Sequence, residues 1–253
     1  MKSKVFAART WKEIMRDPLS YIFCLGFPLV MLVIMSIIDK SIPAEAGMQV
    51  FRIRNLAPGI VYFGLTFVML FTSIQVSKDR TTALLLRLYA SPMRPVEYIF
   101  GYTIPMVVLA MVQMVICFTV SVVIGLCTGD SLLMPEVLLS MLALLPSVFL
   151  FVGFGILFGT LVNEKAAPGL CSVFISAAGM IGGIWMDIDG LGGAIKTVAR
   201  ALPFYHGVSL ARMPFRENTE GALEHILWTV ICGVLVYGLA VTVFQGKMKR
   251  DIR

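Results

Sequence analysis

The sequence predicts an all-α integral membrane protein with six membrane-spanning helices. Three observations support this prediction. Of the 253 residues, 58% are hydrophobic and only 14% are charged, against roughly 25% charged in an ordinary soluble domain. The hydrophobic residues form long blocks, and the charges gather between the blocks. Lys and Arg are also distributed unequally between alternate connecting segments, as they are in proteins with a fixed orientation in the membrane.

The six predicted spans share a length of about 20 apolar residues and contain no Asp, Glu, Lys or Arg. A helix rises about 1.5 Å per residue and the hydrocarbon core is about 30 Å thick, so roughly 20 residues are needed to cross it. The predicted spans are residues 20–38, 57–77, 99–126, 137–162, 166–186 and 226–246. A large soluble protein with six buried helices is excluded, because too little polar chain would remain to cover them.

The orientation follows from the positive residues. With the N-terminus in the cytoplasm, fourteen of the 21 Lys and Arg residues lie on the cytoplasmic side and seven lie outside. The short outer turn 127–136 carries only Asp130 and Glu136 as charges. An excess of Lys and Arg marks cytoplasmic loops. We therefore predict that both termini are cytoplasmic, with residues 247–253 as a cytoplasmic tail.

The first predicted element, within residues 1–18, is an amphipathic helix that lies in the membrane interface, with Trp11 and Arg16 among its marker residues. On a helical wheel the apolar half consists of Val5, Ala8, Trp11, Ile14 and Met15. The polar half consists of Arg9, Lys12, Glu13 and Arg16. Lys4 and Phe6 break this pattern. Such a helix places its basic side toward anionic head groups. It ends at Asp17-Pro18, since a residue before proline leaves helical geometry. A plain basic anchor beside the first span is the alternative.

The segment between the second and third spans, residues 78–98, predicts two short helices across a bend. Leucines cluster between Arg80 and Ser91-Pro92, and a helix restarts after Pro95. An apolar helix at the inner membrane face either rests on lipid or docks into a groove of a partner protein. The residues alone leave both readings open.

The segment before the sixth span, residues 187–225, is too long for a simple turn and predicts a re-entrant pair of short helices. His206 and His225 lie far apart in it and are interpreted as isolated surface or interface residues, not metal ligands. Within the spans, Gly155-x-x-x-Gly159 and Gly179-x-x-x-Gly183 allow close approach of helices. Internal packing is the favoured interpretation of both pairs, and a subunit interface is the alternative.

The sequence contains none of the motifs that would make it an enzyme by itself. It has no Gly-x-x-x-x-Gly-Lys-Ser/Thr loop, no His-Glu-x-x-His and no Gly-x-Ser-x-Gly, so no ATP site, metal site or other cofactor site is expected in this chain. The basic residues are scattered, which disfavours nucleic-acid binding. The spans contain no carboxylate, which disfavours an ion-coupled secondary transporter.

Three short motifs, in this order, carry a resemblance to a known family. They are Arg-Asp-Pro at 16–18, Ala-Ser-Pro-Met-Arg-Pro-Val-Glu-Tyr at 90–98, and Gly-Gly-Ile-Trp at 182–185 leading to Leu-Pro-Phe-Tyr-His at 202–206. Nearly the whole chain resembles the membrane subunit, or permease, of type-2 ATP-binding-cassette (ABC) exporters, which export drugs, antibiotics and polysaccharides. Two departures are Thr81-Thr82-Ala83-Leu84, where a Gly-Thr-x-Glu-like stretch is common, and Asp187, where a proline is usual.

The resemblance implies a single transmembrane domain over 1–253, with six spans within 20–246. It implies a cytoplasmic ABC ATPase as a separate partner that binds ATP and magnesium, and a second six-span permease that forms a homodimer or heterodimer, with spans two and five near the shared axis. The segment 78–98 would be the coupling helix that contacts the ATPase. Its expected coupling residues are Leu84, Leu85, Arg87, Leu88, Ser91, Pro92, Arg94 and Glu97.

We therefore expect a multi-pass permease in the plasma (inner) membrane, in contact with lipid, that exports an amphiphilic compound such as a drug, an antibiotic or a lipid- or glycan-linked substrate. Thr72, Gln75, Ser172 and Ser176 are the hypothesised substrate path. The rival functions are a non-transporting receptor or immunity protein and a secondary transporter.

Overall fold

The structure is a computed structural model that describes residues 2–42, 49–81, 95–188, 190, 193–216 and 221–251. Helices and turns account for its secondary structure, and no strand occurs in these ranges. The all-α prediction is confirmed for them. The coupling residues from Leu84 to Arg94 fall outside the described ranges, whereas Glu97 lies in the first turn of a long helix.

The chain begins with α1 (Lys2–Ile14), which is followed by a helical segment made of α2 (Pro18–Tyr21), a π-helical turn (Ile22–Gly26) and α3 (Phe27–Ser41). The long helices α4 (Ile53–Thr81), α6 (Pro95–Thr128) and α7 (Met134–Leu161) come next. The remaining elements are α8 (Ala167–Ile181), α9 (Ala194–Ala201), α10 (Pro203–Arg212), a 3-10 turn (Met213–Phe215) and α11 (Ala222–Asp251).

Five helical segments in the described ranges are long and apolar enough to cross a membrane: Pro18–Ser41, Ile53–Arg80, Pro95–Thr128, Met134–Leu161 and Ala222–Lys247. The predicted fifth span, residues 166–186, corresponds to α8, an apolar helix of only 15 residues that ends at Ile181. At about 1.5 Å per residue, α8 is about 22 Å long. The chain turns after it, and Gly183 takes a φ of 75°, which glycine adopts without steric cost. The extent predicted for the fifth span was therefore too long.

Helix α4 is the centre of the bundle. In the most apolar 18-residue stretch of α4, 78% of the residues are buried, whereas the same share is 22% in the first and in the last spanning helix. Helix α7 packs directly against it through two glycines. A Cβ atom at Gly155 would lie 2.5 Å from the Cβ of Thr72, and one at Gly159 would lie 2.5 Å from the carbonyl oxygen of Ser73. Internal packing is confirmed for this pair of glycines. Internal packing also holds for Gly179, where a Cβ atom would lie 2.8 Å from Trp185 and 3.6 Å from Phe63. Gly183 lies beyond the end of α8, so the two glycines do not form a pair on one helix.

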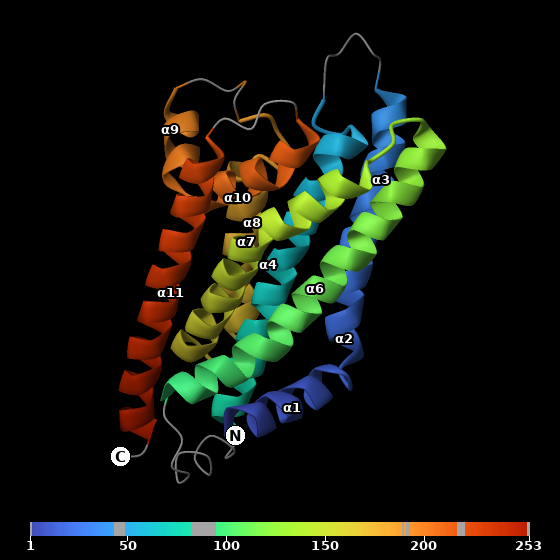
Figure 1. Ribbon diagram of the computed structural model, residues 1–253. Helices are drawn as coiled ribbons and strands as arrows, with labels where there is room; N and C mark the ends of the chain where they lie inside the picture. The colour runs from blue at the N-terminus through green and yellow to red at the C-terminus, as the bar shows by residue number, and fades with distance from the viewer. Residues whose placement is uncertain are drawn as a thin grey trace.

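Figure 1 shows how the helices are arranged at the two ends of the bundle. Helix α1 lies across one end, at the ends of α4 and α6, and the C-terminal part of α11 reaches the same end. Helices α9 and α10 lie at the opposite end. We call these the α1 end and the α10 end. The common location of α1 and the last turns of α11 agrees with the predicted location of both termini on one side of the membrane.

Helix α1 ends just before Asp17-Pro18, as the sequence predicts, and the Asp17 carboxylate accepts a hydrogen bond from the backbone N–H of Leu19. Its protein-facing side differs from the predicted apolar half. Phe6, which breaks the amphipathic pattern, is only 4% exposed, whereas Val5 is 72% exposed. A helical wheel separates apolar from polar residues, but it does not show which side of α1 contacts the other helices.

Two short helices, α9 and α10, are present before α11, where the sequence predicts a pair; their insertion into the bilayer stays a prediction. The interpretation of His206 and His225 as isolated residues was wrong. Their Nδ1 atoms lie 2.7 Å apart, His206 Nε2 lies 2.8 Å from the Arg200 carbonyl oxygen, and the His206 ring stacks on Trp228. The two histidines are 19 residues apart on different helices, so their spacing in the sequence gives no sign of the contact.

Candidate functional site

Charged and polar side chains from three helices meet at the α1 end of the bundle. We call this group the α1-end cluster. It consists of Arg9 and Glu13 on α1, Gln75 and Asp79 on α4, and Tyr102 on α6.

The contacts form a continuous chain across the three helices. Arg9 Nη2 lies 2.5 Å from Glu13 Oε1 and 3.4 Å from Asp79 Oδ1. Gln75 Nε2 donates to the second carboxylate oxygen of Glu13 over 2.8 Å. The Tyr102 hydroxyl donates to Asp79 Oδ2 over 2.8 Å. Each of the two carboxylates therefore binds a residue of another helix.

The local geometry follows from helical spacing. Arg9 and Glu13 are four residues apart on α1, as are Gln75 and Asp79 on α4, and residues at this spacing lie on one face of a helix. The apolar part of the same contact is the Phe6 ring, which packs edge-on against Tyr98 and Tyr102 with ring centroids 5.6 Å and 5.0 Å away. Gly101 leaves the room for this ring, since a Cβ atom there would lie 2.3 Å from it.

The electrostatics of the cluster depend on burial. The side chain of Asp79 is 4% exposed, whereas those of Arg9 and Glu13 are 33% and 39% exposed. Burial alone lowers the pKa of Arg9, but the nearby carboxylates of Asp79 and Glu13 outweigh it, so that the pKa of Arg9 is raised. Arg9 thus remains charged. Removing one partner of a buried charge is costly, because the other partner is left without compensation.

A second contact fixes the same end of α4. Arg80 Nη1 donates to the carbonyl oxygens of Gly159 and Thr160 in the last turn of α7, and lies 3.5 Å from that of Val162. These carbonyl groups have no partner within the helix, and a cation is favourable at the C-terminus of a helix. The end of α4 is therefore tied to both α1 and α7, one residue before the helix stops at Thr81.

The α1-end cluster lies beside the predicted coupling segment. Asp79 lies just before residues 82–94 and Tyr102 lies soon after them, so the cluster joins the two helices that flank this segment. Of the predicted coupling residues only Glu97 is described, in the first turn of α6. Leu84, Leu85, Arg87, Leu88, Ser91, Pro92 and Arg94 lie outside the described residues.

The predicted markers of the interfacial helix both lie at α1. Trp11 is partly buried and, with Pro105 and Val108 of α6, lines a hollow of about 450 Å³. Arg16 is exposed just after the helix, where its N–H donates to the Glu13 carbonyl oxygen.

The four residues of the hypothesised substrate path lie in different surroundings. Thr72 is fully buried, and its hydroxyl donates to the Val68 carbonyl oxygen over 2.6 Å. Gln75 is held by Glu13. Ser172 and Ser176 are exposed on α8. Their participation in a substrate path stays a prediction.

Sequence reasoning missed the roles of Arg9, Glu13, Asp79 and Tyr102. It assigned Arg9 and Glu13 to the polar half of α1, with the basic side toward anionic head groups, but both contact α4. One signal was available: Gln75 and Asp79 lie at helical spacing in the last turns of an apolar block. No sequence pattern names their partners, because the bond from Gln75 to Glu13 joins residues 62 positions apart.

The comparisons with known proteins agree with this architecture. Residues 2–215 match the family model described as ABC-2 type transporter, and the match covers α1, the α1-end cluster and every helix up to α10. No curated protein is significantly similar to the chain. The family match covers well over half of the 253 residues, and the multiple apolar helices make this a multi-pass membrane protein. The chain belongs to the ABC-2 type transporter family and is a permease component of a membrane transporter.

Proposed function

We propose that this chain is the permease subunit of an ATP-driven exporter that moves an amphiphilic compound outward across the plasma membrane. A separate cytoplasmic ATPase binds ATP and magnesium, and a second permease completes the translocation path. The observation that supports the proposal most is the α1-end cluster, because it joins α1 to both helices that flank residues 82–94.

In the proposed mechanism, ATP binding closes the ATPase dimer and moves the segment from Leu84 to Glu97. Asp79 contacts Arg9 of α1 and Tyr102 of α6 through its two carboxylate oxygens. A movement of the segment would therefore reach α4, α6 and α1 together. Arg80 extends the connection to α7. The α1 end then lies in the cytoplasm, where the ATPase is located.

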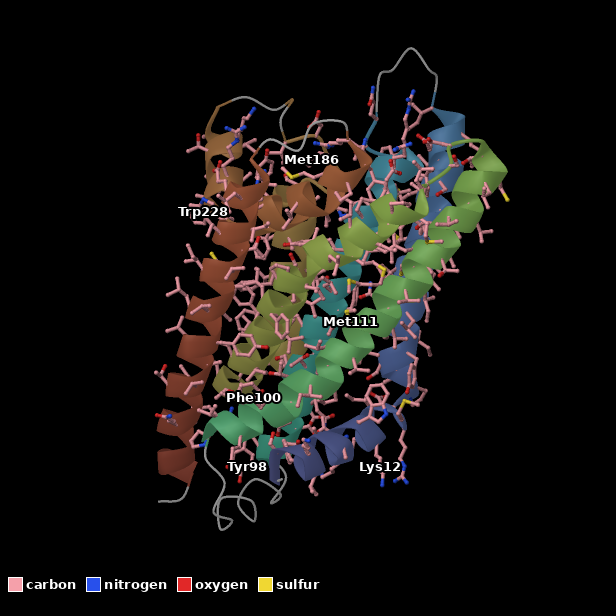
Figure 2. The ribbon with its side chains drawn as sticks, in the orientation of Figure 1. Lys12, Tyr98, Phe100, Met111, Met186 and Trp228 are labelled. Carbon is pink, nitrogen blue, oxygen red and sulfur yellow. The ribbon has the colours of Figure 1, made fainter. Side chains whose placement is uncertain are left out.

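The test is to disrupt the α1-end cluster while keeping side-chain sizes similar. We expect the double variant Arg9→Gln, Glu13→Gln to lower ATPase stimulation and transport at least about tenfold, since the ion pairs to α4 and between the two residues are lost. The measurements are ATP hydrolysis by the copurified partner and ATP-dependent uptake into inverted vesicles. Lys12→Gln is the matched control, because Lys12 is exposed on the side of α1 that faces away from the bundle (Figure 2).

A parallel variant, Leu85→Ala with Arg87→Ala, tests the coupling segment itself. If both pairs of substitutions leave the ATPase bound and leave hydrolysis and transport at the level of Lys12→Gln, the coupling assignment is wrong. If the wild-type chain binds the ATPase but ATP drives no outward transport of amphiphiles, the exporter proposal is wrong.

A further inference from the structure

A cavity of about 910 Å³ opens at the α10 end of the bundle, opposite the α1-end cluster. Its walls come from the residues before and within the first turn of α4, the segments after α6 and after α8, and the end of α10 with the 3-10 turn that follows. Four arginines and two aspartates line it: Arg52, Arg54, Arg212, Arg216, Asp130 and Asp187. Figure 2 labels one of its apolar residues, Met186, at this end of the molecule. The size suits a small organic molecule.

Arg212 is the unusual residue of this cavity, because its charged side chain is only 7% exposed. Its Nε donates to the Asn55 carbonyl oxygen over 3.0 Å, and Nη1 donates to that of Gly183 over 2.8 Å. A longer bond of 3.4 Å joins Nη2 to the carbonyl oxygen of Ile184. These three bonds fix the plane of the guanidinium. A guanidinium has five N–H groups, so two remain without a partner among the described residues.

Within the described residues, the positive charge of Arg212 has no ion pair. No carboxylate in the described part of the chain lies within 4 Å of it. Burial, followed by the neighbouring charge of Arg216, lowers the pKa of Arg212 to about 10, and Asp187 offsets this only in part. Transfer of a charge from water into a protein is unfavourable unless the charge is paired. The site therefore favours an added anion.

The other arginines of the cavity differ in what holds them. Arg54 forms an ion pair with Glu136, with 2.5 Å between Nη2 and Oε1. Arg52 and Arg216 are exposed, and neither forms an ion pair with another described residue. A second and a third cation are thus available at the rim, next to the buried one.

Apolar side chains form another part of the wall, beside the polar Gln49 and Asn55. Phe51, Trp185, Met186 and Phe215 line the same cavity. Trp185 packs edge-on against Phe63 of α4, with the ring centroids 5.2 Å apart. A ligand with one acidic group and an apolar body would match both parts of the surface.

We propose that this cavity binds the acidic head group, a phosphate or a carboxylate, of an amphiphilic anion, with Arg212 at its base and Arg52 and Arg216 at its rim. Arginine binds both groups with two parallel hydrogen bonds. The anion is either the head group of a membrane lipid or a non-lipid organic acid. The proposal goes beyond the transport function and does not depend on it, since binding needs neither the ATPase nor a gradient.

The experiment uses Trp185 as the reporter. The chain has three tryptophans, so Trp11→Phe and Trp228→Phe leave Trp185 as the only one. The protein is purified in a nonionic detergent and titrated with dihexanoyl phosphatidylglycerol, with the zwitterionic dihexanoyl phosphatidylcholine, with 1-naphthoate and with inorganic phosphate, while Trp185 fluorescence is recorded.

We expect saturable binding of the anionic lipid, the naphthoate or both, and at least about tenfold weaker binding of phosphatidylcholine, because one charge-assisted hydrogen bond changes binding by about this factor. Binding of the lipid alone identifies a lipid head-group site. Binding of the naphthoate alone identifies a site for non-lipid acids. Inorganic phosphate lacks an apolar part and should bind more weakly than either.

The substitutions Arg52→Gln and Arg216→Gln, each at an exposed position, should weaken anion binding about tenfold when combined. Arg212→Lys tests the buried group and should also weaken it, since lysine keeps the charge but lacks the planar fork. Arg200→Gln is the matched control, because it removes an exposed arginine at the same end that does not line the cavity.

The proposal is overturned if neither anion binds, if phosphatidylcholine binds equally well, or if Arg200→Gln weakens binding as much as the rim substitutions do. If the wild-type chain showed no ATP-driven export, the proposed function would be contradicted and this binding result would be unchanged. The two proposals therefore fail separately.

Discussion

Phe6 anchors α1 by contacts with Tyr98, Gly101 and Tyr102 at the start of α6. Its ring fills space that the missing side chain of Gly101 leaves open. Val5, the next residue toward the N-terminus, is mostly exposed. A helical wheel of α1 does not show which of these two residues is buried against α6. That depends on Gly101, a glycine about 95 positions later in the sequence. A pattern within one helix contains no information about that distant position.

At this scale we predict that Phe6→Ala lowers the free energy of unfolding by about 3–5 kcal/mol, the usual cost of emptying a buried aromatic site. The measurement is thermal unfolding of the purified protein in detergent, followed by circular dichroism. Val5→Ala is the control and should change the unfolding free energy by less than about 0.5 kcal/mol, as an exposed substitution does. Equal effects of both substitutions would show that α1 does not dock through Phe6.

At the scale of the elements, α7 packs closely against the backbone of α4. Gly155 lies so close to α4 that a Cβ atom would be 2.6 Å from the backbone oxygen of Met69. Backbone cannot move aside as easily as a flexible side chain. The contact therefore depends on the absence of a side chain, which is the feature that a small-x-x-x-small motif expresses in the sequence.

We expect Gly155→Ala to destabilise the bundle by about 1–3 kcal/mol through overpacking. The unfolding midpoint in detergent measures it. Gly238→Ala on α11 makes the same chemical change where no atom lies within 4 Å of the added group, so it should leave the midpoint unchanged or raise it. A lower midpoint for Gly238→Ala than for Gly155→Ala would contradict the described packing of α4 on α7.

Most helices could be predicted from the sequence, because a long apolar block without charges has few alternatives to a spanning helix. The described α6, for instance, spans Pro95–Thr128 against a prediction of 99–126. The end of α8 could not be predicted in this way. Hydropathy continues to Met186, but Gly183 adopts a positive φ, and hydropathy carries no information on backbone dihedral angles.

The candidate site was less accessible to sequence reasoning than the fold. Gln75 was assigned to the hypothesised substrate path, and the structure shows that it binds Glu13 of α1. His206 and His225 were interpreted as isolated, but they meet because α10 and α11 lie against each other. Each of these pairings is a contact between separate helices, which requires the tertiary fold.

At the scale of the whole molecule, α8 has an exposed surface that includes Ser172 and Ser176. The proposed second permease would cover part of such a surface, and the resemblance places the fifth span near the shared axis. We predict that Ser176→Cys, in a variant without the five native cysteines, forms a disulfide between two copies of the chain on mild oxidation. Bonded cysteines require Cα atoms within about 7 Å of each other.

Two copies with different affinity tags are coexpressed, and the disulfide-linked dimer is measured by nonreducing gel electrophoresis. Val234→Cys on α11 is the control, since Val234 is 67% exposed and lies on a peripheral helix. A dimer that copurifies but links only through position 234 would contradict the assignment of α8 to the axis. Failure of the two tagged copies to copurify would indicate a heterodimer with another permease.

Arg212 also has a consequence for how the protein is made. A lone arginine at the centre of a membrane-inserting helix costs about 2.5–3.5 kcal/mol in the translocon. Arg212 is instead the last residue of α10, where the cost of burying its charge depends on its hydrogen-bond partners. The carbonyl groups that receive its hydrogen bonds belong to Asn55, Gly183 and Ile184, all of which leave the ribosome earlier. The residues that supply the acceptors are therefore synthesised before Arg212, so that the guanidinium can donate these hydrogen bonds as soon as α10 packs in the bundle.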